Sequence, residues 1–290
     1  HELTRKDKEA DRTRHVDTLS ATTGPVFLTY PDQPEMDARV QALAQKAPAY
    51  QFTTPDGIGH SFWVMDDDKD IAAVTKIFER LPVLYIADGH HRSASAAAVA
   101  RKRKAANPHH TGQESYNFFL AVIFPSNQLY IMDYNRLVKD LNGLDKAQFL
   151  EKVHEKFEVE KTGQARPGAR HQFGMYLDGE WYTLRAKDGS FDAQDPVAAL
   201  DVSILQNNLL APVLGIGDPR TDKRINFVGG IRGLGELEKR VNSGEYQVAF
   251  SMFPTSIEEL MKVADAHLIM PPKSTWFEPK LRSGLVTYKY

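Results

Sequence analysis

An unbroken apolar run at residues 83–87 leads straight into the polar sequence Asp-Gly-His-His-Arg at residues 88–92. The run predicts a strand that is buried on both faces. The alanine-rich stretch that follows, as far as residue 106, predicts a helix. Gly89 therefore stands where a strand turns into a helix, and glycine there allows a tight turn and the close approach of a ligand.

Helix-like and strand-like segments alternate irregularly along the rest of the chain. Helices are expected at residues 34–47, 71–81, 146–157, 195–210, 234–241 and 256–266. Strands are expected at residues 26–30, 173–177, 181–184, 224–228 and 247–253, with a strand pair at 116–124 and 128–132. Because βαβ units do not repeat, the pattern predicts an α+β fold with mixed sheets. A segment at 162–171, rich in Gly, Pro, Arg and Lys, predicts two parts, 1–162 and 163–290.

The composition excludes several classes of protein. The 290 residues are 42% hydrophobic and 26% charged, which is typical of a globular chain. The absence of cysteine excludes disulfides, zinc–thiolate sites and cysteine nucleophiles, and it fits a reducing cytoplasm. A net charge of -2 gives no bias towards polyanions such as nucleic acid. Neither a secretory signal nor an apolar stretch long enough for a bilayer is visible, so we expect a cytoplasmic protein without a membrane partner.

The junction at residues 88–92 is the best candidate for a binding site. Free N–H groups at a helix start carry partial positive charge and suit a phosphate. Arg92 can bind phosphate oxygens through two donors at once. Asp88 could cap the helix, fix a histidine tautomer, or ligate a metal that bridges phosphates. The alternative is a capped helix whose histidines and arginine face solvent, and we favour the anion site.

Two other segments compete with this junction. Residues 271–284 bring hydroxyls, cations and prolines into an expected loop, a composition common in anion sites, although a plain surface loop is equally consistent. Residues 218–235 place charged side chains and glycines around a strand, but the spacing fits neither a dinucleotide fingerprint nor a Walker A loop. The histidines at 109–110 and the cations at 101–104 are better explained by a solvated loop and a helix C-terminus.

Several of these segments together resemble one family. The sequences at residues 1–5, 88–92 and 271–284, and with them 134–136, 218–222 and 228–230, resemble recurrent segments of the bacterial and archaeal domain-of-unknown-function family 1015. The resemblance covers essentially the whole chain. Members of the family usually carry a further N-terminal segment, so we expect this sequence to start inside the family's first domain.

The resemblance also implies a chemistry. The family is similar to the ParB/sulfiredoxin-like superfamily, in which Gly-x-x-Arg at a helix start binds nucleotide phosphates. Sulfiredoxins need a cysteine where His90 stands, so their reaction is excluded. Free-serine kinases carry Asp-Gly-His-x-Arg, which this chain matches, and this implies phosphoryl transfer from ATP or ADP, with Mg2+, to a serine-like hydroxyl. ParB itself hydrolyses CTP as a DNA clamp, but the charge balance and the lack of an evident helix-turn-helix speak against nucleic acid.

Particular residues are expected to take roles in this reaction, and the role of Glu2 is the one implied by the kinase relatives. The catalytic candidates are Glu2, Asp88, His90 and His91, with Glu2 as the base for the hydroxyl proton and Asp88 also as the metal ligand. The phosphate-binding candidates are Gly89, Arg92, Arg5, Lys273, Ser274, Thr275 and Arg282. Two alternatives stay open: a nucleotide-dependent switch that acts through a protein or DNA partner, and a non-catalytic protein that binds a phosphorylated metabolite.

Overall fold

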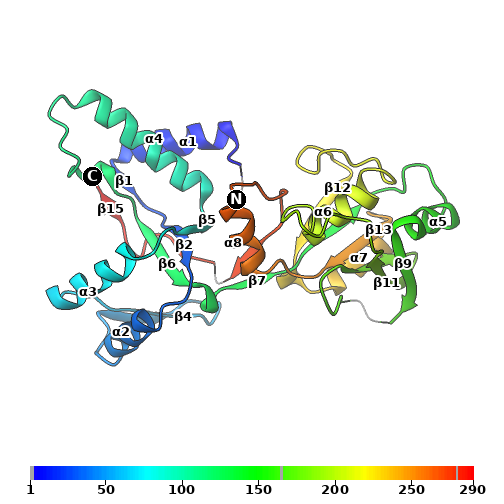
Figure 1. The fold of residues 1–290 in the computed structure, drawn as a ribbon, viewed down its shortest axis with the longest axis horizontal. Helices are drawn as coiled ribbons and strands as arrows, with labels where there is room; N and C mark the ends of the chain where they lie inside the picture. The colour runs from blue at the N-terminus through cyan, green and yellow to red at the C-terminus, as the bar shows by residue number, and fades with distance from the viewer. Residues whose placement is uncertain (1–2, 164–165, 279) are drawn as a thin grey trace.

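The computed structural model describes residues 3–163, 166–278 and 280–290 (Figure 1). The helices are α1 (Lys6–Leu19), α2 (Pro34–Ala44), α3 (Asp68–Glu79), α4 (His90–Ala106), α5 (Lys146–Lys156), α6 (Asp201–Leu205), α7 (Gly235–Asn242) and α8 (Ile257–Asp265), and α6 continues as a π-helical turn, η3 (Gln206–Leu210). The strands are β1 (Ala21–Thr22), β2 (Val26–Tyr30), β3 (Tyr50–Thr53), β4 (Gly59–Phe62), β5 (Tyr85–Asp88), β6 (Ala121–Pro125), β7 (Tyr130–Met132), β8 (Tyr134–Val138), β9 (Phe157–Thr162), β10 (Gln172–Leu177), β11 (Glu180–Ala186), β12 (Ile225–Gly229), β13 (Val248–Met252), β14 (Trp276–Glu278) and β15 (Tyr288–Lys289). The predicted α+β class is confirmed. Within the described residues, no helix has both the length and the apolar character that crossing a membrane requires.

A small mixed sheet carries the strand–helix junction. Its order is β5-β2-β6, with β2 antiparallel to β5 and parallel to β6. The central strand β2 is buried along its whole length, and its Tyr30 packs against Met36 of α2 and Ile77 of α3. The expectation that residues 83–87 are buried on both faces is wrong for Val83 and Leu84, which are 46% and 40% exposed. The strand β5 begins only after these two residues, and within it burial alternates, with Tyr85 and Ala87 buried and Ile86 only partly buried.

A larger sheet of six strands forms the other half of the molecule. Its order is β12-β8-β13-β10-β11-β9, and every pairing is antiparallel. Alternate residues face opposite cores, as in β10, where Met175 and Leu177 lie in the larger core and Tyr176 lies in the smaller one. Helices α5, α6 and α8 pack into the larger core, and α7 covers the smaller one. Figure 1 shows α8 between the two halves.

Two local predictions are wrong. The strands expected at 116–124 and 128–132 do not pair with each other, because β6 joins β2 and β7 joins β14. The helix expected from Asp195 begins only at Asp201. The Asp195 carboxylate accepts the N–H groups of Val197 and Ala198 at 2.7 and 2.9 Å, which makes a single capped turn rather than a helix start.

The chain crosses between the halves more than once. The six-stranded sheet takes strands from both sides of position 162, because β8 and β9 precede it and the other four follow it. The division at 162 therefore stays a proposal, and a boundary before Tyr134 would keep this sheet in one unit. Near its end the chain returns, since β14 pairs with β7 and β15 pairs with β1. This return brings residues 270–276 and Lys280 opposite the strand–helix junction.

Candidate functional site

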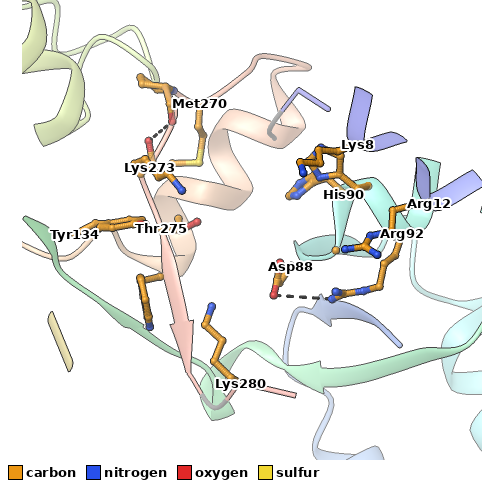
Figure 2. Close-up of a pocket in the computed structure, with 15 residues that line it drawn as sticks. Lys8, Arg12, Asp88, His90, Arg92, Tyr134, Met270, Lys273, Thr275 and Lys280 are labelled. Carbon is orange, nitrogen blue, oxygen red and sulfur yellow. Dashed lines mark hydrogen bonds and ion pairs between the residues drawn. The ribbon is translucent and has the colours of Figure 1, made fainter. Parts of the chain in front are cut away.

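A cavity of about 410 Å³ separates the strand–helix junction from the returning C-terminal segment (Figure 2). In the close-up, Lys273, Thr275 and Tyr134 lie on one side, and His90, Arg92, Arg12 and Lys8 lie on the other. The lining residues are Lys8, Arg12, Asp88, Gly89, His90, His91, Arg92, Tyr134, Met270, Pro271, Lys273, Ser274, Thr275, Trp276 and Lys280. We call this space the first cavity.

Gly89 and Arg92 fit closely together in the turn between β5 and α4. Gly89 is the residue before the first helical residue and has φ +101°, in the left-handed region that glycine tolerates. A Cβ atom at this position would lie 2.9 Å from Nη2 of Arg92, so the guanidinium is folded back over the glycine. An ion pair of 3.9 Å joins this nitrogen to the Asp88 carboxylate. The Nε–H of Arg92 is buried and makes no hydrogen bond within the described residues.

The two histidines of the junction have different surroundings. Burial is the main cause that lowers the pKa of His90 to about 4, and the nearby charges of His91 and Arg92 contribute to the same shift. His90 is therefore uncharged at neutral pH. His91 accepts the backbone N–H of Arg5 at its Nε2 atom, at 3.0 Å. Because that nitrogen accepts, the proton of neutral His91 lies on Nδ1, where it can be donated to a ligand.

Helix α1 contributes two cations that the sequence analysis did not select. Lys8 and Arg12 are four residues apart, so they share one face of α1, and that face lines the first cavity. The C-terminal end of α1 is fixed to α4 through Asp17, whose carboxylate is 3.1 Å from Nε of Arg103 and 2.5 Å from Nζ of Lys102. Only the amphipathic spacing of these cations could have indicated them, and that spacing also fits a solvated helix.

The opposite wall is a loop that hydrogen bonds hold in place. Lys273 has φ +61°, and its carbonyl accepts from Nη2 of Arg136 at 3.0 Å. The Ser274 hydroxyl donates to the Pro271 carbonyl at 2.6 Å, and the Ser274 carbonyl accepts from Thr255 at 2.9 Å. Arg136 is buried, and burial lowers its pKa to about 10, so it is still a cation at neutral pH.

The ammonium groups of the two lysines in this wall each lie over an aromatic ring. Nζ of Lys273 lies 5.4 Å from the centre of the Tyr134 ring, and Nζ of Lys280 lies 5.0 Å from that of Trp276. The two rings meet edge to face with their centres 5.2 Å apart. The Trp276 ring also explains one of the glycines that the sequence analysis weighed as a nucleotide motif. A Cβ atom at Gly229 would lie 2.7 Å from the Trp276 ring, so packing requires glycine there.

The first cavity concentrates positive charge. Its lining contains five permanent cations, and Asp88 is the one carboxylate among the described residues that line it; the cations are Lys8, Arg12, Arg92, Lys273 and Lys280. The whole chain has a net charge of -2, so this excess is local. A ligand with several negative charges, such as a chain of phosphates, suits such a lining.

The structure brings together most, but not all, of the residues that the sequence analysis selected. Those that line the first cavity are Asp88, Gly89, His90, His91, Arg92, Lys273, Ser274 and Thr275. Arg5 supplies its backbone N–H to His91, but its side chain pairs with Asp7. Arg282 pairs with Asp56 and is not part of this lining. Glu2 lies outside the described residues. The residues not selected are Lys8, Arg12, Tyr134, Met270, Pro271, Trp276 and Lys280.

A metal ion at this site would need oxygen ligands from bound phosphates in addition to those of the protein. Among the residues that the structure describes, no group of three or more His, Cys, Asp or Glu side chains is placed to hold a metal ion. Mg2+ at phosphate sites is usually held by one or two carboxylates together with phosphate oxygens and water. Asp88 fits that arrangement as a single carboxylate, provided that phosphates supply the further oxygens.

A family model described as protein of unknown function (DUF1015) matches residues 1–203, so the chain belongs to this family. The predicted membership is confirmed, whereas the wider ParB/sulfiredoxin-like relationship stays a prediction. No curated protein matches the sequence.

Solved structures with similar folds share little sequence with this chain. A free serine kinase in complex with AMP is 14% identical to this chain. The match covers 96% of this chain and 82% of the kinase chain, with a TM-score of 0.41. SbnI with a C-terminal truncation, from Staphylococcus aureus, is 12% identical, with 98% and 81% covered and a TM-score of 0.47. A conserved hypothetical protein from Pyrococcus furiosus is 14% identical, with 98% and 88% covered and a TM-score of 0.40. Likeness at this level carries no argument about activity.

Proposed function

We propose that this protein is a small-molecule kinase that transfers a phosphoryl group from ATP or ADP to the hydroxyl of a serine-like amino acid. The observation that carries the proposal is the set of five cations that line the first cavity, with a single carboxylate among its described lining residues. Phosphoryl transfer needs positioning and neutralisation of charge more than covalent help from the protein. A cationic cavity with one carboxylate and a neutral histidine supplies those requirements.

In the proposed reaction, the hydroxyl oxygen of the acceptor attacks the terminal phosphorus of the nucleotide. The new O–P bond forms as the bond from phosphorus to the bridging oxygen breaks, and that oxygen leaves with the rest of the nucleotide. Arg92 and the lysines offset the charge of the phosphoryl oxygens, and the Nδ1–H of His91 is a further donor. The hydroxyl proton passes to a carboxylate, and Asp88, with a side chain 48% exposed, is the described candidate. Glu2 stays a prediction for the same role.

A bound Mg2+ ion would offset phosphate charge and orient the transferred group. Asp88 would either hold this ion or accept the hydroxyl proton, and where it holds the ion Glu2 stays the prediction for the base. The 3.9 Å contact of Asp88 with Arg92 keeps that carboxylate beside the phosphate-binding turn. The identity of the base and of the metal ligand are separate parts of the proposal, and both depend on phosphates being bound at the same turn.

Replacement of Arg92 tests the proposal. Arg92→Ala should weaken ADP binding at least tenfold, because a hydrogen bond to a charged group contributes about 1.5–3 kcal/mol. Arg101→Ala is the matched control, since Arg101 lies on the same helix and is exposed. Calorimetric titration measures the affinity, and thermal unfolding shows that both variants are folded.

Turnover assays separate the kinase from its two rivals. A kinase converts ATP or ADP only when a hydroxyl amino acid is added. Hydrolysis that needs no acceptor, together with nucleotide-dependent association, would favour the switch. Saturable binding of a phosphorylated metabolite without turnover would favour the binding protein. Either result, or an Arg92→Ala variant with unchanged affinity for ADP, would contradict the proposal.

A further inference from the structure

A second cavity of about 220 Å³ adjoins the first and shares two arginines with it. Its lining residues are Arg12, His15, Val16, Thr22, Thr23, Gly24, Val26, Arg92, Phe119, Leu120 and Ser283. The two shared residues are Arg12 and Arg92, so the same guanidinium-bearing side chains border both spaces. The function proposed above gives no role to this second cavity.

Helix α1 runs along both cavities. Lys8 lines only the first, Arg12 lines both, and Val16 lines only the second. These residues are spaced by four, so they lie on one face of the helix, with a rise of roughly 6 Å from each to the next. Along this face the lining changes from cationic to apolar. An elongated ligand that lies beside α1 would therefore meet phosphate-binding groups at one end and an apolar surface at the other.

Arg92 forms part of the boundary between the two cavities. A Cβ atom at Gly24, in the second cavity, would lie 3.5 Å from Cδ of Arg92 and 3.5 Å from Oγ of Ser283. The same arginine folds its guanidinium over Gly89 in the first cavity. Its aliphatic stem thus contacts one space while its charged group faces the other.

The lining of the second cavity suits a nucleoside better than an amino acid. Among its described lining residues there is no carboxylate, so an ammonium group would have no counter-ion there. That argues against the amino-acid acceptor as its occupant. Val16, Val26 and Phe119 supply apolar and aromatic surface, and Thr23 and Ser283 supply hydroxyls. A flat heterocycle joined to a sugar suits this combination.

We propose that the second cavity binds the nucleoside of the donor nucleotide, with a purine base against Phe119 and the phosphates passing between Arg12 and Arg92 into the first cavity. This inference rests on the proposed function, because it places the uncharged end of the same nucleotide. It also adds a specificity determinant, since it separates recognition of the base from recognition of the phosphates.

The test compares ADP with inorganic pyrophosphate, which has the phosphates but no nucleoside. Phe119→Ala should weaken ADP binding about tenfold, the loss expected when a base loses an aromatic stacking partner, and should leave pyrophosphate binding unchanged. Phe118→Ala is the matched control, because Phe118 is the preceding residue, is 52% exposed and lines neither cavity. Gly24→Leu places a side chain in the second cavity beside Cδ of Arg92, so it should weaken ADP binding more than pyrophosphate binding.

The outcomes separate this inference from the proposed function. If the unmodified protein binds neither pyrophosphate nor ADP, the phosphate site fails, and the nucleoside site fails with it. If it binds both equally well, or if Phe119→Ala and Gly24→Leu leave ADP binding unchanged, only the nucleoside site is overturned. The same holds if the two variants raise the KM for L-serine and leave ADP affinity as it was. Thermal unfolding of every variant confirms that it is folded.

Discussion

At the scale of single residues, the candidate site depends on how Gly89 and Arg92 share one small volume. The positive φ of Gly89 turns the chain from β5 into α4, and the missing side chain leaves room for the guanidinium of Arg92. This part of the site could be predicted from the sequence because its residues are neighbours in the chain. The roles of Lys8 and Arg12 could not be predicted from the sequence, because their position beside the same turn depends on how α1 packs against α4.

Gly89→Ala should weaken ADP binding and should also lower the stability of the protein. The left-handed backbone costs a residue with a Cβ atom about 1–2 kcal/mol, and at 2.9 Å this Cβ would displace the Arg92 guanidinium. Gly57→Ala is the control, since Gly57 has φ +82° and nothing lies within 4 Å of its Cβ position. Urea unfolding should show a similar loss of stability in both variants, whereas ADP titration should show a loss of affinity only for Gly89→Ala. Equal affinities would mean that Arg92 does not bind the phosphates.

At the scale of elements, the local sequence predicted which helices and strands exist. It predicted less well how the strands pair and where the helices begin. The helix near residues 146–157 is found as α5, and its first turn has a capping box between Asp145 and Gln148. The Asp-Pro sequence at 195 is equally typical of a helix start, yet it makes one capped turn and the helix begins at Asp201. The carboxylates of Asp145 and Asp195 each accept the backbone N–H three residues further on. Only the packing of the residues that follow decides whether a helix continues.

Helix α1 should loosen when its anchor on α4 is removed. Asp17→Asn retains the size of the side chain but loses the charge that pairs with Lys102 and Arg103, so amide exchange in α1 should become faster. ADP affinity should fall by a few fold, because α1 carries Lys8 and Arg12. Asp11→Asn, which breaks only an exposed pair with Arg14, should change neither quantity. Hydrogen exchange followed by mass spectrometry measures this, with the α5 peptides as an internal reference, and unchanged α1 exchange in Asp17→Asn would contradict it.

At the scale of the whole molecule, the cavity walls come from segments that are far apart in the chain. The hydroxyl of Tyr85 in β5 donates to Asp265 in α8 at 2.7 Å, and the C-terminal strand β15 pairs with β1. The sequence indicated the segment at 271–284 as a competing anion site, but the return of the chain makes part of it, chiefly residues 271–276, the opposite wall of the same cavity. Such long-range contacts depend on the complete packing of the chain, which periodicity and turn signals do not specify.

Two buried groups, one in each half of the molecule, should give the stability of the protein opposite dependences on pH. Burial lowers the pKa of His90 in the first half to about 4, and burial raises the pKa of Asp201 in the second half to about 7. Between pH 6.5 and 4 the unfolded chain takes up a proton on His90 that the folded chain refuses, so this residue makes stability fall as the pH falls. Between pH 3.8 and 7 the folded chain keeps a proton on Asp201 that the unfolded chain releases, so this residue makes stability fall as the pH rises.

Two variants separate these opposing contributions. The stability of His90→Gln relative to the unmodified protein should increase by about 3 kcal/mol as the pH falls from 6.5 to 4. For Asp201→Asn, the relative stability should increase as the pH rises from 4 to 7, and the amide still offers Oδ1 to the His171 N–H that Asp201 accepts at 2.9 Å. Urea unfolding at several pH values measures both. Because the two effects oppose each other between pH 4 and 6.5, the unmodified protein should show a flatter profile there than either variant. Profiles that run parallel in all three proteins would mean that neither group is held in its buried, uncharged form.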